Sequence, residues 1–220
     1  MGQRVTFPSN AHTCEGYLAG KGPAVVVIQE WWGLVPHIQD VVERFANEGF
    51  LAIAPDLYHG NTTKSPNEAQ KMLMELDVDR ALSEIMGAGA YALQHPDCTS
   101  KKYGVVGFCM GGGLAQHAAV NDPNVGAAAS FYGGFKKVVT DWEKLNAPLL
   151  LIYGENDQGV PAAQGRELGA KLQKMGKSAE VVVYPDANHA FFNDSRPEVY
   201  NPDAAADAWQ RTLELFRRSL

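Results

Sequence analysis

The sequence predicts an α/β fold in which a mostly parallel central sheet carries helices on both faces and an N-terminal hairpin at one edge. Short apolar runs alternate with longer amphipathic runs along the chain, which is typical of strands joined by crossover helices. Most of the short runs are apolar at nearly every position, as expected of parallel strands that helices bury on both sides.

Six apolar runs predict the strands of the parallel sheet. They are Ala24–Gln29, Phe50–Pro55, Tyr103–Phe108, Ala127–Gly133, Pro148–Gly154 and Ala179–Pro185. The segments "RVTFPS" and "EGYLAG" precede them and predict the edge hairpin. Pro8 suits an edge strand better than a central one, because proline has no N–H to donate to a neighbouring strand.

Amphipathic runs between these strands predict the helices. In "HIQDVVERFANEG" the apolar residues fall on one face, and Gly49 is placed to end the helix. Ser65 is a candidate N-cap, with Pro66 in the first turn of the helix that follows. Further helices are expected over Asp77–Gln94, Met110–Val120, Pro161–Met175 and Asp203–Arg218.

The bulk composition is that of a globular protein. The 220 residues, 45% of them hydrophobic, are expected to form one domain over residues 1–220. The net charge of −6 argues against binding to nucleic acid or to anionic membranes, because both attract cationic proteins. No apolar run approaches the roughly 18 residues needed to span a bilayer.

Cysteine and histidine spacing predicts neither a disulfide framework nor a metal site. Cys14, Cys98 and Cys109 are an odd number of distant cysteines, and the opening "MGQRVTFPSNAH" lacks the apolar stretch of a secretory signal. We therefore expect reduced thiols and a cytoplasmic location. Five of the six histidines are scattered without paired ligand spacing: His12, His37, His59, His95 and His117.

Three reactive side chains follow strands of the predicted sheet. Cys109 comes directly after the third strand of the parallel set, Asp157 after the fifth and His189 after the sixth. Ligands bind at the carboxyl ends of parallel strands, so we expect these side chains to meet at one edge. Their chain order of nucleophile, acid and histidine is that of the triad in hydrolases with such a sheet.

The segment "GFCMGGG" has the outline of a sharp turn that presents a nucleophile. Gly107 and Gly111 flank Cys109 where larger side chains would collide, and the helix that begins at Met110 favours an anion at its N-terminus. A thiolate there can attack an acyl carbon. The alternative for Cys109 is a small buried residue in a glycine-rich turn.

The other two members of the triad have alternatives as well. His189 can accept a proton and later activate water, or it can be an ordinary histidine in a surface loop. Asp157 is the candidate that orients the imidazole, or it is a turn aspartate. Glu155, Asp186 and Asp194 are its rivals for that role.

Further candidates follow the first and second strands. Glu30 ends an apolar run, so it either pairs with a cation at the rim or meets the Cys109 thiol and controls its ionisation. The backbone N–H groups of Met110 and of the loop near Trp31 are candidate donors to an oxyanion. The substrate pocket is expected to be lined by Trp32, Tyr58, Phe191 and Asn193.

Five segments carry a resemblance to a known family. They are "QEWWG", "APDLY", "GFCMGGG", "YGENDQGVP" and "YPDANHAF", in this order and each at a predicted strand end. Together they resemble the dienelactone hydrolase family of the α/β-hydrolase fold, from about Val25 to the C-terminal helix.

The resemblance implies hydrolysis of a small ester or lactone through Cys109, His189 and Asp157, with an acyl-thioester intermediate. It further implies that Glu30 contacts the thiol at rest, is displaced by substrate, and then helps to deprotonate the sulfur. The oxyanion donors would be the backbone N–H groups of Trp31 and Met110. The resemblance implies no cofactor and no metal, and it leaves the oligomeric state open.

The sequence departs from the family at its two arginines that bind the substrate carboxylate. One of these positions, four residues after the histidine, is Asn193, and the segment Pro66–Leu76 has no arginine at the other. Arg196 or Lys71 could substitute, although lysine lacks the bidentate fork. The substrate could therefore be a neutral ester or an ester of a different shape. A thioesterase or acyltransferase with the same triad and a non-catalytic binding protein are the alternative functions.

Overall fold

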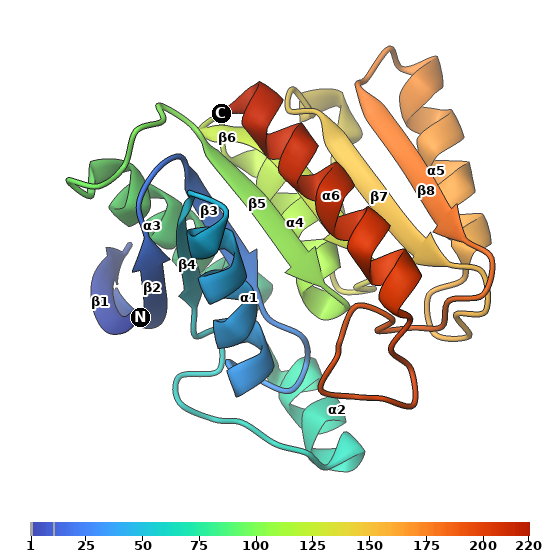
Figure 1. The fold of residues 1–220 in the computed structure, drawn as a ribbon, viewed down its shortest axis with the longest axis horizontal. Helices are drawn as coiled ribbons and strands as arrows, with labels where there is room; N and C mark the ends of the chain where they lie inside the picture. Colours follow the sequence, from blue (N-terminus) through green and yellow to red (C-terminus); the bar gives the residue numbers. More distant parts are fainter. Residues whose placement is uncertain (1, 11) are drawn as a thin grey trace.

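The computed structural model describes residues 2–10 and 12–220, which include one sheet of eight strands (Figure 1). The strand order across the sheet is β1-β2-β4-β3-β5-β6-β7-β8. The strands are β1 Gln3–Ser9, β2 His12–Gly20, β3 Ala24–Ile28, β4 Leu51–Pro55, β5 Tyr103–Phe108, β6 Val125–Phe131, β7 Leu149–Gly154 and β8 Ala179–Tyr184. The predicted fold class, a mostly parallel sheet with an N-terminal edge hairpin, is confirmed.

The hairpin and the parallel strands meet at β4. Strands β1 and β2 pair antiparallel, and β2 pairs antiparallel with β4. Every other neighbouring pair in the sheet is parallel. Pro8 lies in the edge strand β1, as its missing N–H requires.

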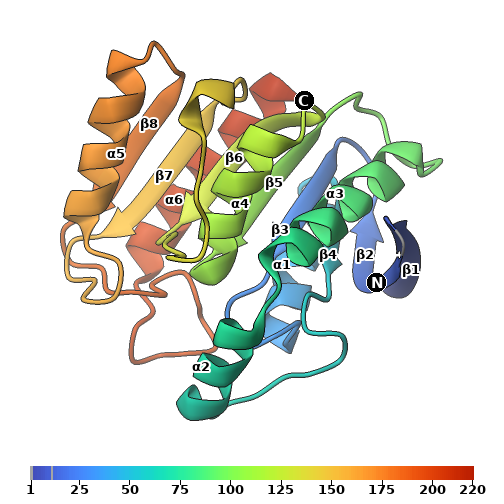
Figure 2. The same ribbon diagram turned by 180° about the vertical axis from the view of Figure 1, so that it is seen from behind.

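Helices cover both faces of the sheet. They are α1 Pro36–Asn47, α2 Pro66–Glu75, α3 Val78–Gln94, α4 Met110–Asn121, α5 Ala162–Lys174 and α6 Pro202–Ser219, with a short 3₁₀ turn η1 at Trp142–Lys144. Helices α1 and α6 lie on the face seen in Figure 1, and α3, α4 and α5 lie on the face seen in Figure 2. Helix α2 stands apart from both layers, beyond the carboxyl edge of the sheet.

Each face of the sheet has its own hydrophobic core. In β3, Val26 and Ile28 join the core beneath α3 and α4, whereas Val25 and Val27 join the core beneath α1 and α6. All five residues of β3 are fully buried, because successive side chains of a strand point to opposite faces and both faces are covered. This double burial explains why the central strands are apolar at every position.

Among the parallel strands, β6 departs furthest from its predicted bounds. The sequence predicted a strand over Ala127–Gly133, but β6 begins at Val125 and ends at Phe131. Tyr132 has a φ of 39°, in the left-handed region that an extended strand cannot contain. Within residues 2–10 and 12–220, no helix combines the length and the apolar character needed to cross a membrane.

Candidate active site

The carboxyl ends of β3, β5, β7 and β8 bring the predicted reactive residues to one edge of the sheet. Cys109 follows β5, Asp157 lies in the loop after β7, and His189 lies in the loop after β8. Glu30 stands two residues beyond the end of β3. Because these strands are parallel neighbours or near neighbours, residues far apart in sequence become adjacent here.

Cys109 occupies a strained turn between β5 and α4. Its backbone has φ 58° and ψ −118°, which is unusual for a residue with a side chain. A Cβ on Gly107 would lie 1.9 Å from the carbonyl oxygen of Gly111, and one on Gly111 would lie 2.4 Å from that of Gln29. The two glycines are therefore required by the close approach of backbone on either side of the cysteine.

Asp157 and His189 form a hydrogen-bonded pair in which the carboxylate is buried. The distance from His189 Nδ1 to Asp157 Oδ2 is 2.7 Å. The other carboxylate oxygen of Asp157 accepts the N–H groups of Gly159 and Val160, each at 2.8 Å. These bonds fix the carboxylate, which in turn fixes the orientation of the imidazole and leaves its Nε2 free for the nucleophile.

The rival carboxylates lie elsewhere. Glu155 is exposed and pairs with Arg166, while Asp194 pairs with Arg44. Asp186 is exposed, and its backbone carbonyl accepts the side-chain amide of Asn201. None of the three makes a hydrogen bond to His189 among the described residues.

The surroundings of His189 favour its charged form. Burial alone would lower the pKa of the imidazole, but the hydrogen bond to Asp157 and the neighbouring Cys109 outweigh it and raise the pKa to about 10. Cys109 is thus close enough to interact with the ring directly. The imidazole side chain is 30% exposed, so one side of the pair is accessible from solvent.

Glu30 is buried and bonded to Asn193. The amide Nδ2 of Asn193 donates to Glu30 Oε2 at 2.9 Å. Burial raises the pKa of Glu30, although Asn193, His189 and Arg196 each act to lower it. The hydrogen bond found for Glu30 therefore comes from Asn193, and the predicted contact of Glu30 with the thiol stays a prediction.

Two residues predicted to line the substrate pocket are buried in the structure. Asn193 is 2% exposed, and its side-chain oxygen accepts the N–H and hydroxyl of Ser195. Phe191 is fully buried, with ring centroids 5.6 Å from Tyr132 and 5.3 Å from Tyr184. The loop after β8 turns both side chains inward, and their contact with substrate stays a prediction.

The tryptophans after β3 stay partly accessible. Trp31 and Trp32 are half-buried and meet edge to face, with centroids 5.0 Å apart. The guanidinium of Arg196 lies 5.9 Å from the Trp32 ring centroid, so this cation borders the site. Lys71 is exposed on α2, where it pairs with Glu75 at 3.8 Å.

Tyr58 connects the nucleophile to a neighbouring cavity. Its hydroxyl donates to Met110 Sδ at 3.4 Å, and burial together with the Cys109 sulfur raises the pKa of the phenol. Tyr58 also lines a cavity of about 270 Å³ between the loop after β4 and helices α2 and α3. The predicted pocket residue Tyr58 therefore lies between the thiol and this open space.

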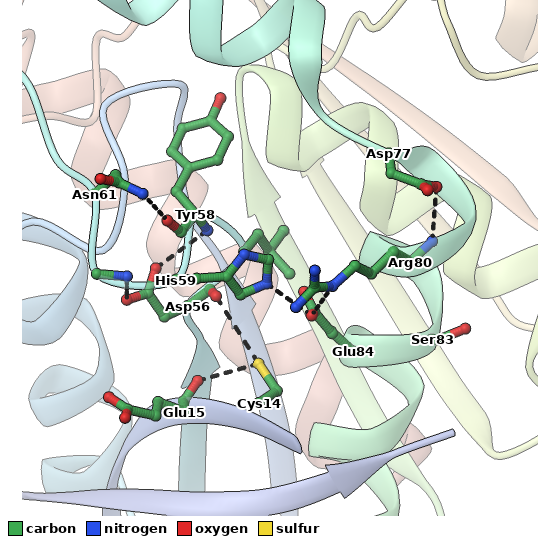
Figure 3. A network of polar contacts seen from close by, with 12 residues as sticks. Cys14, Glu15, Asp56, Tyr58, His59, Asn61, Asp77, Arg80, Ser83 and Glu84 are labelled. Atoms are coloured by element: carbon green, nitrogen blue, oxygen red, sulfur yellow. Dashed lines mark hydrogen bonds and ion pairs between the residues drawn. The ribbon is translucent and has the colours of Figure 1, made fainter. Parts of the chain in front are cut away.

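A polar cluster that the sequence did not predict lines the same cavity (Figure 3). His59 Nε2 and Arg80 Nε both lie 2.8 Å from the same oxygen of Glu84. The Glu84 side chain is 1% exposed, while His59 and Arg80 reach the surface. Figure 3 shows the Tyr58 ring turned away from this cluster.

The sequence also gave no indication of Tyr132. This residue follows β6 directly, is fully buried, and packs with its ring centroid 4.9 Å from that of His189. Its position after a parallel strand is the signal that could have drawn attention to it, since Cys109 was found by the same criterion.

Residues 11–220 match the sequence profile of the dienelactone hydrolase family. The chain belongs to this family. Among the relatives of this chain, protein usf from Aquifex pyrophilus is 37% identical over 230 residues that cover all of both chains. A protein of Aquifex aeolicus, provisionally named carboxymethylenebutenolidase, is 34% identical over the whole of both chains.

The fold agrees with that of solved members. The structure of a protein from Klebsiella pneumoniae, provisionally named dienelactone hydrolase, superposes with a TM-score of 0.88 at 29% identity. The match covers 99% of this chain and 98% of that one. This dienelactone hydrolase family member is thus a hydrolase of ester or lactone bonds with the α/β-hydrolase fold.

Proposed function

We propose that this protein hydrolyses a small carboxylic ester or lactone through a triad of Cys109, His189 and Asp157. The observation that carries the proposal is the 2.7 Å hydrogen bond from His189 Nδ1 to Asp157, at the sheet edge where Cys109 also lies and raises the pKa of the same imidazole. The strained turn at Cys109 supports it, because strain of this kind concentrates at functional residues.

In the first step the Cys109 sulfur attacks the carbonyl carbon of the ester. Within the described chain, the backbone N–H groups of Trp31 and Met110 have no hydrogen-bond acceptor, and we assign them to the oxyanion. Since the pKa of His189 is raised to about 10, its imidazolium is available at neutral pH to give a proton to the leaving alcohol. Loss of the alcohol leaves an acyl thioester on Cys109.

In the second step water replaces the alcohol. His189, now neutral, takes a proton from water as the water oxygen attacks the thioester carbonyl. Collapse of the tetrahedral intermediate releases the carboxylic acid and returns the thiolate. Asp157 holds the ring in one orientation through both steps and stabilises its charged form.

The thiol proton must leave before the first attack, and we assign its acceptor as Glu30. Burial raises the pKa of this carboxyl above its ordinary value, which makes it a stronger base than an exposed glutamate. In the proposal, substrate moves Glu30 from its partner Asn193 toward the sulfur. The proton returns from Glu30 to the thiolate when the product leaves.

The cavity beside Tyr58 supports a substrate that extends away from the thiol toward α2 and α3. The family arginine position occupied by Asn193 is buried and uncharged here, so a carboxylate on the substrate is not required at that point. The proposal therefore covers neutral esters as well as carboxylate-bearing ones. A cytoplasmic location and the absence of a cofactor remain predictions from the sequence.

Removal of the thiol tests the proposal. Wild type and Cys109→Ala are compared on a panel of neutral and carboxylate-bearing aryl esters, with Cys98→Ala as the matched control at a second partly buried thiol. We expect Cys109→Ala to lose at least roughly a thousandfold in kcat/KM while the control stays active. Equal turnover by wild type and Cys109→Ala would contradict the triad, and competition by added alcohols would reveal acyl transfer.

A further inference from the structure

Tyr132 lies at the centre of the site without a role in the steps above. It directly follows β6, has a φ of 39°, and is fully buried. Its ring packs against His189 and Phe191 at centroid distances of 4.9 and 5.6 Å. Its backbone N–H donates to the carbonyl of Ile152, so both the backbone and the ring are held in place.

The hydroxyl of Tyr132 has no hydrogen-bond partner among the described residues, although it is inaccessible to solvent. A buried polar group without a partner is costly, and native structures contain few of them. A phenylalanine would fill the same space as the ring without this cost. The retained hydroxyl therefore indicates a partner that it meets in another state of the site.

Glu30 is the group that this hydroxyl is placed to meet. Burial raises the pKa of Tyr132, and the charge of Glu30 has the next largest effect in the same direction. Cys109 and Asp157 act in that direction too, while Arg196 opposes them. Ile28, Gly107 and Ser130 are register partners in β3, β5 and β6, so Glu30 and Tyr132, each two residues further along, stand on either side of Cys109. Glu30 has its only side-chain hydrogen bond in the described structure from Asn193.

We propose that Tyr132 is a positioning residue whose hydroxyl donates to the Glu30 carboxylate once substrate moves it from Asn193. The hydrogen bond keeps Glu30 ionised beside the sulfur until the proton passes from Cys109 Sγ to a Glu30 oxygen. Tyr132 keeps its own proton throughout. This inference rests on the proposed function, since it concerns the base of that reaction.

The variant Tyr132→Phe separates this role from a structural one. We expect kcat/KM to fall by roughly ten- to hundredfold, because one hydrogen bond to a charged group is lost. The acid limb of the kcat/KM profile should move to higher pH, because Glu30 without the donor has a higher pKa. The other titratable and charged groups that act on Glu30 or Tyr132 are Cys109, Asp157, His189 and Arg196. The melting temperature should be unchanged or higher.

The control is Tyr103→Phe, at the start of β5 and thus at the other end of this strand from Cys109. Tyr103 is also fully buried, but its hydroxyl donates to Asp122 at 2.7 Å. We expect this variant to lower the melting temperature and to leave the pH profile unchanged. Unchanged kcat/KM and pH profile in Tyr132→Phe would overturn the inference. So would failure of Tyr132→Phe to fold, because the hydroxyl would then be structural.

A double-mutant cycle tests whether Tyr132 acts through Glu30. In a Glu30→Gln background, Tyr132→Phe should cause little further loss, whereas additive losses would overturn the inference. The same four proteins are also compared by the rate at which iodoacetamide alkylates Cys109 in the folded protein, measured on the peptide that contains it. This measurement needs no substrate. If Cys109→Ala kept its esterase activity, the proposed function would fail while the alkylation cycle still decided the role of Tyr132.

Discussion

At the scale of single residues, the loop after β8 shows what a sequence can and cannot predict. His189 was predicted from its position after the last strand, and the structure brings it to Asp157. Phe191 and Asn193, in the same loop, were predicted to face substrate and are buried. Strand ends can be located from apolar runs, but the direction of a loop side chain depends on tertiary packing that local sequence does not contain.

The raised pKa of His189 leads to a prediction on pH dependence. The imidazolium that donates to the leaving alcohol should be present throughout the neutral range, because Asp157 and Cys109 raise its pKa to about 10. We expect kcat/KM to hold near neutral pH and to decline as pH rises through about 10. The charged imidazole also contributes to the free energy of unfolding. This contribution is complete below pH 6.5, the ordinary pKa of histidine, and should be lost as the pH rises from 6.5 to about 10.

Steady-state kinetics on an aryl ester from about pH 5 to about pH 11 checks this prediction. Asp157→Asn is the informative comparison, because it removes the charge that helps to raise the pKa while keeping an oxygen for Gly159 and Val160. Its alkaline decline should occur at lower pH than that of wild type. A wild-type decline centred near pH 7 would contradict the assigned charge state.

At the scale of elements, the turn between β5 and α4 is specified by its glycines. The pattern "GFCMGGG" predicted a turn too tight for larger side chains, and the close backbone contacts of Gly107 and Gly111 explain why. The end of β6 was predicted two residues late, because nothing in "AAASFYG" signals that Tyr132 adopts a positive φ. Apolar composition thus predicts where a strand runs, and packing determines where it stops.

Gly111→Ala should disrupt this turn. The new Cβ would lie 2.4 Å from the Gln29 oxygen and 2.6 Å from the Ile28 oxygen, both in backbone that cannot easily move. We expect the free energy of unfolding to fall by about 3 kcal/mol or more. Urea denaturation measures this, with Gly159→Ala as the control, because its Cβ would meet Asp157 at an ordinary 3.5 Å. Equal stability of the two variants would show that the turn tolerates a side chain.

At the scale of the whole molecule, the parallel sheet converts sequence order into a site. Cys109, Asp157 and His189 come from three loops, and the sheet order places these loops at one edge. That convergence could be predicted, because the carboxyl ends of parallel strands share an edge. The cluster of His59, Arg80 and Glu84 could be predicted only in part. Arg80 and Glu84 are four residues apart on one helix, but nothing in the sequence signals that His59 comes to them from the loop after β4.

The central claim is that the reaction passes through a covalent bond between the acyl group and Cys109. The variant His189→Ala, which lacks the base for the second step, is mixed with an activated aryl ester, quenched in acid and digested for mass spectrometry. We expect one acyl group on the peptide that contains Cys109 and none when Cys109 is also replaced by alanine. No adduct, or an adduct on Cys14 or Cys98 instead, would contradict the account.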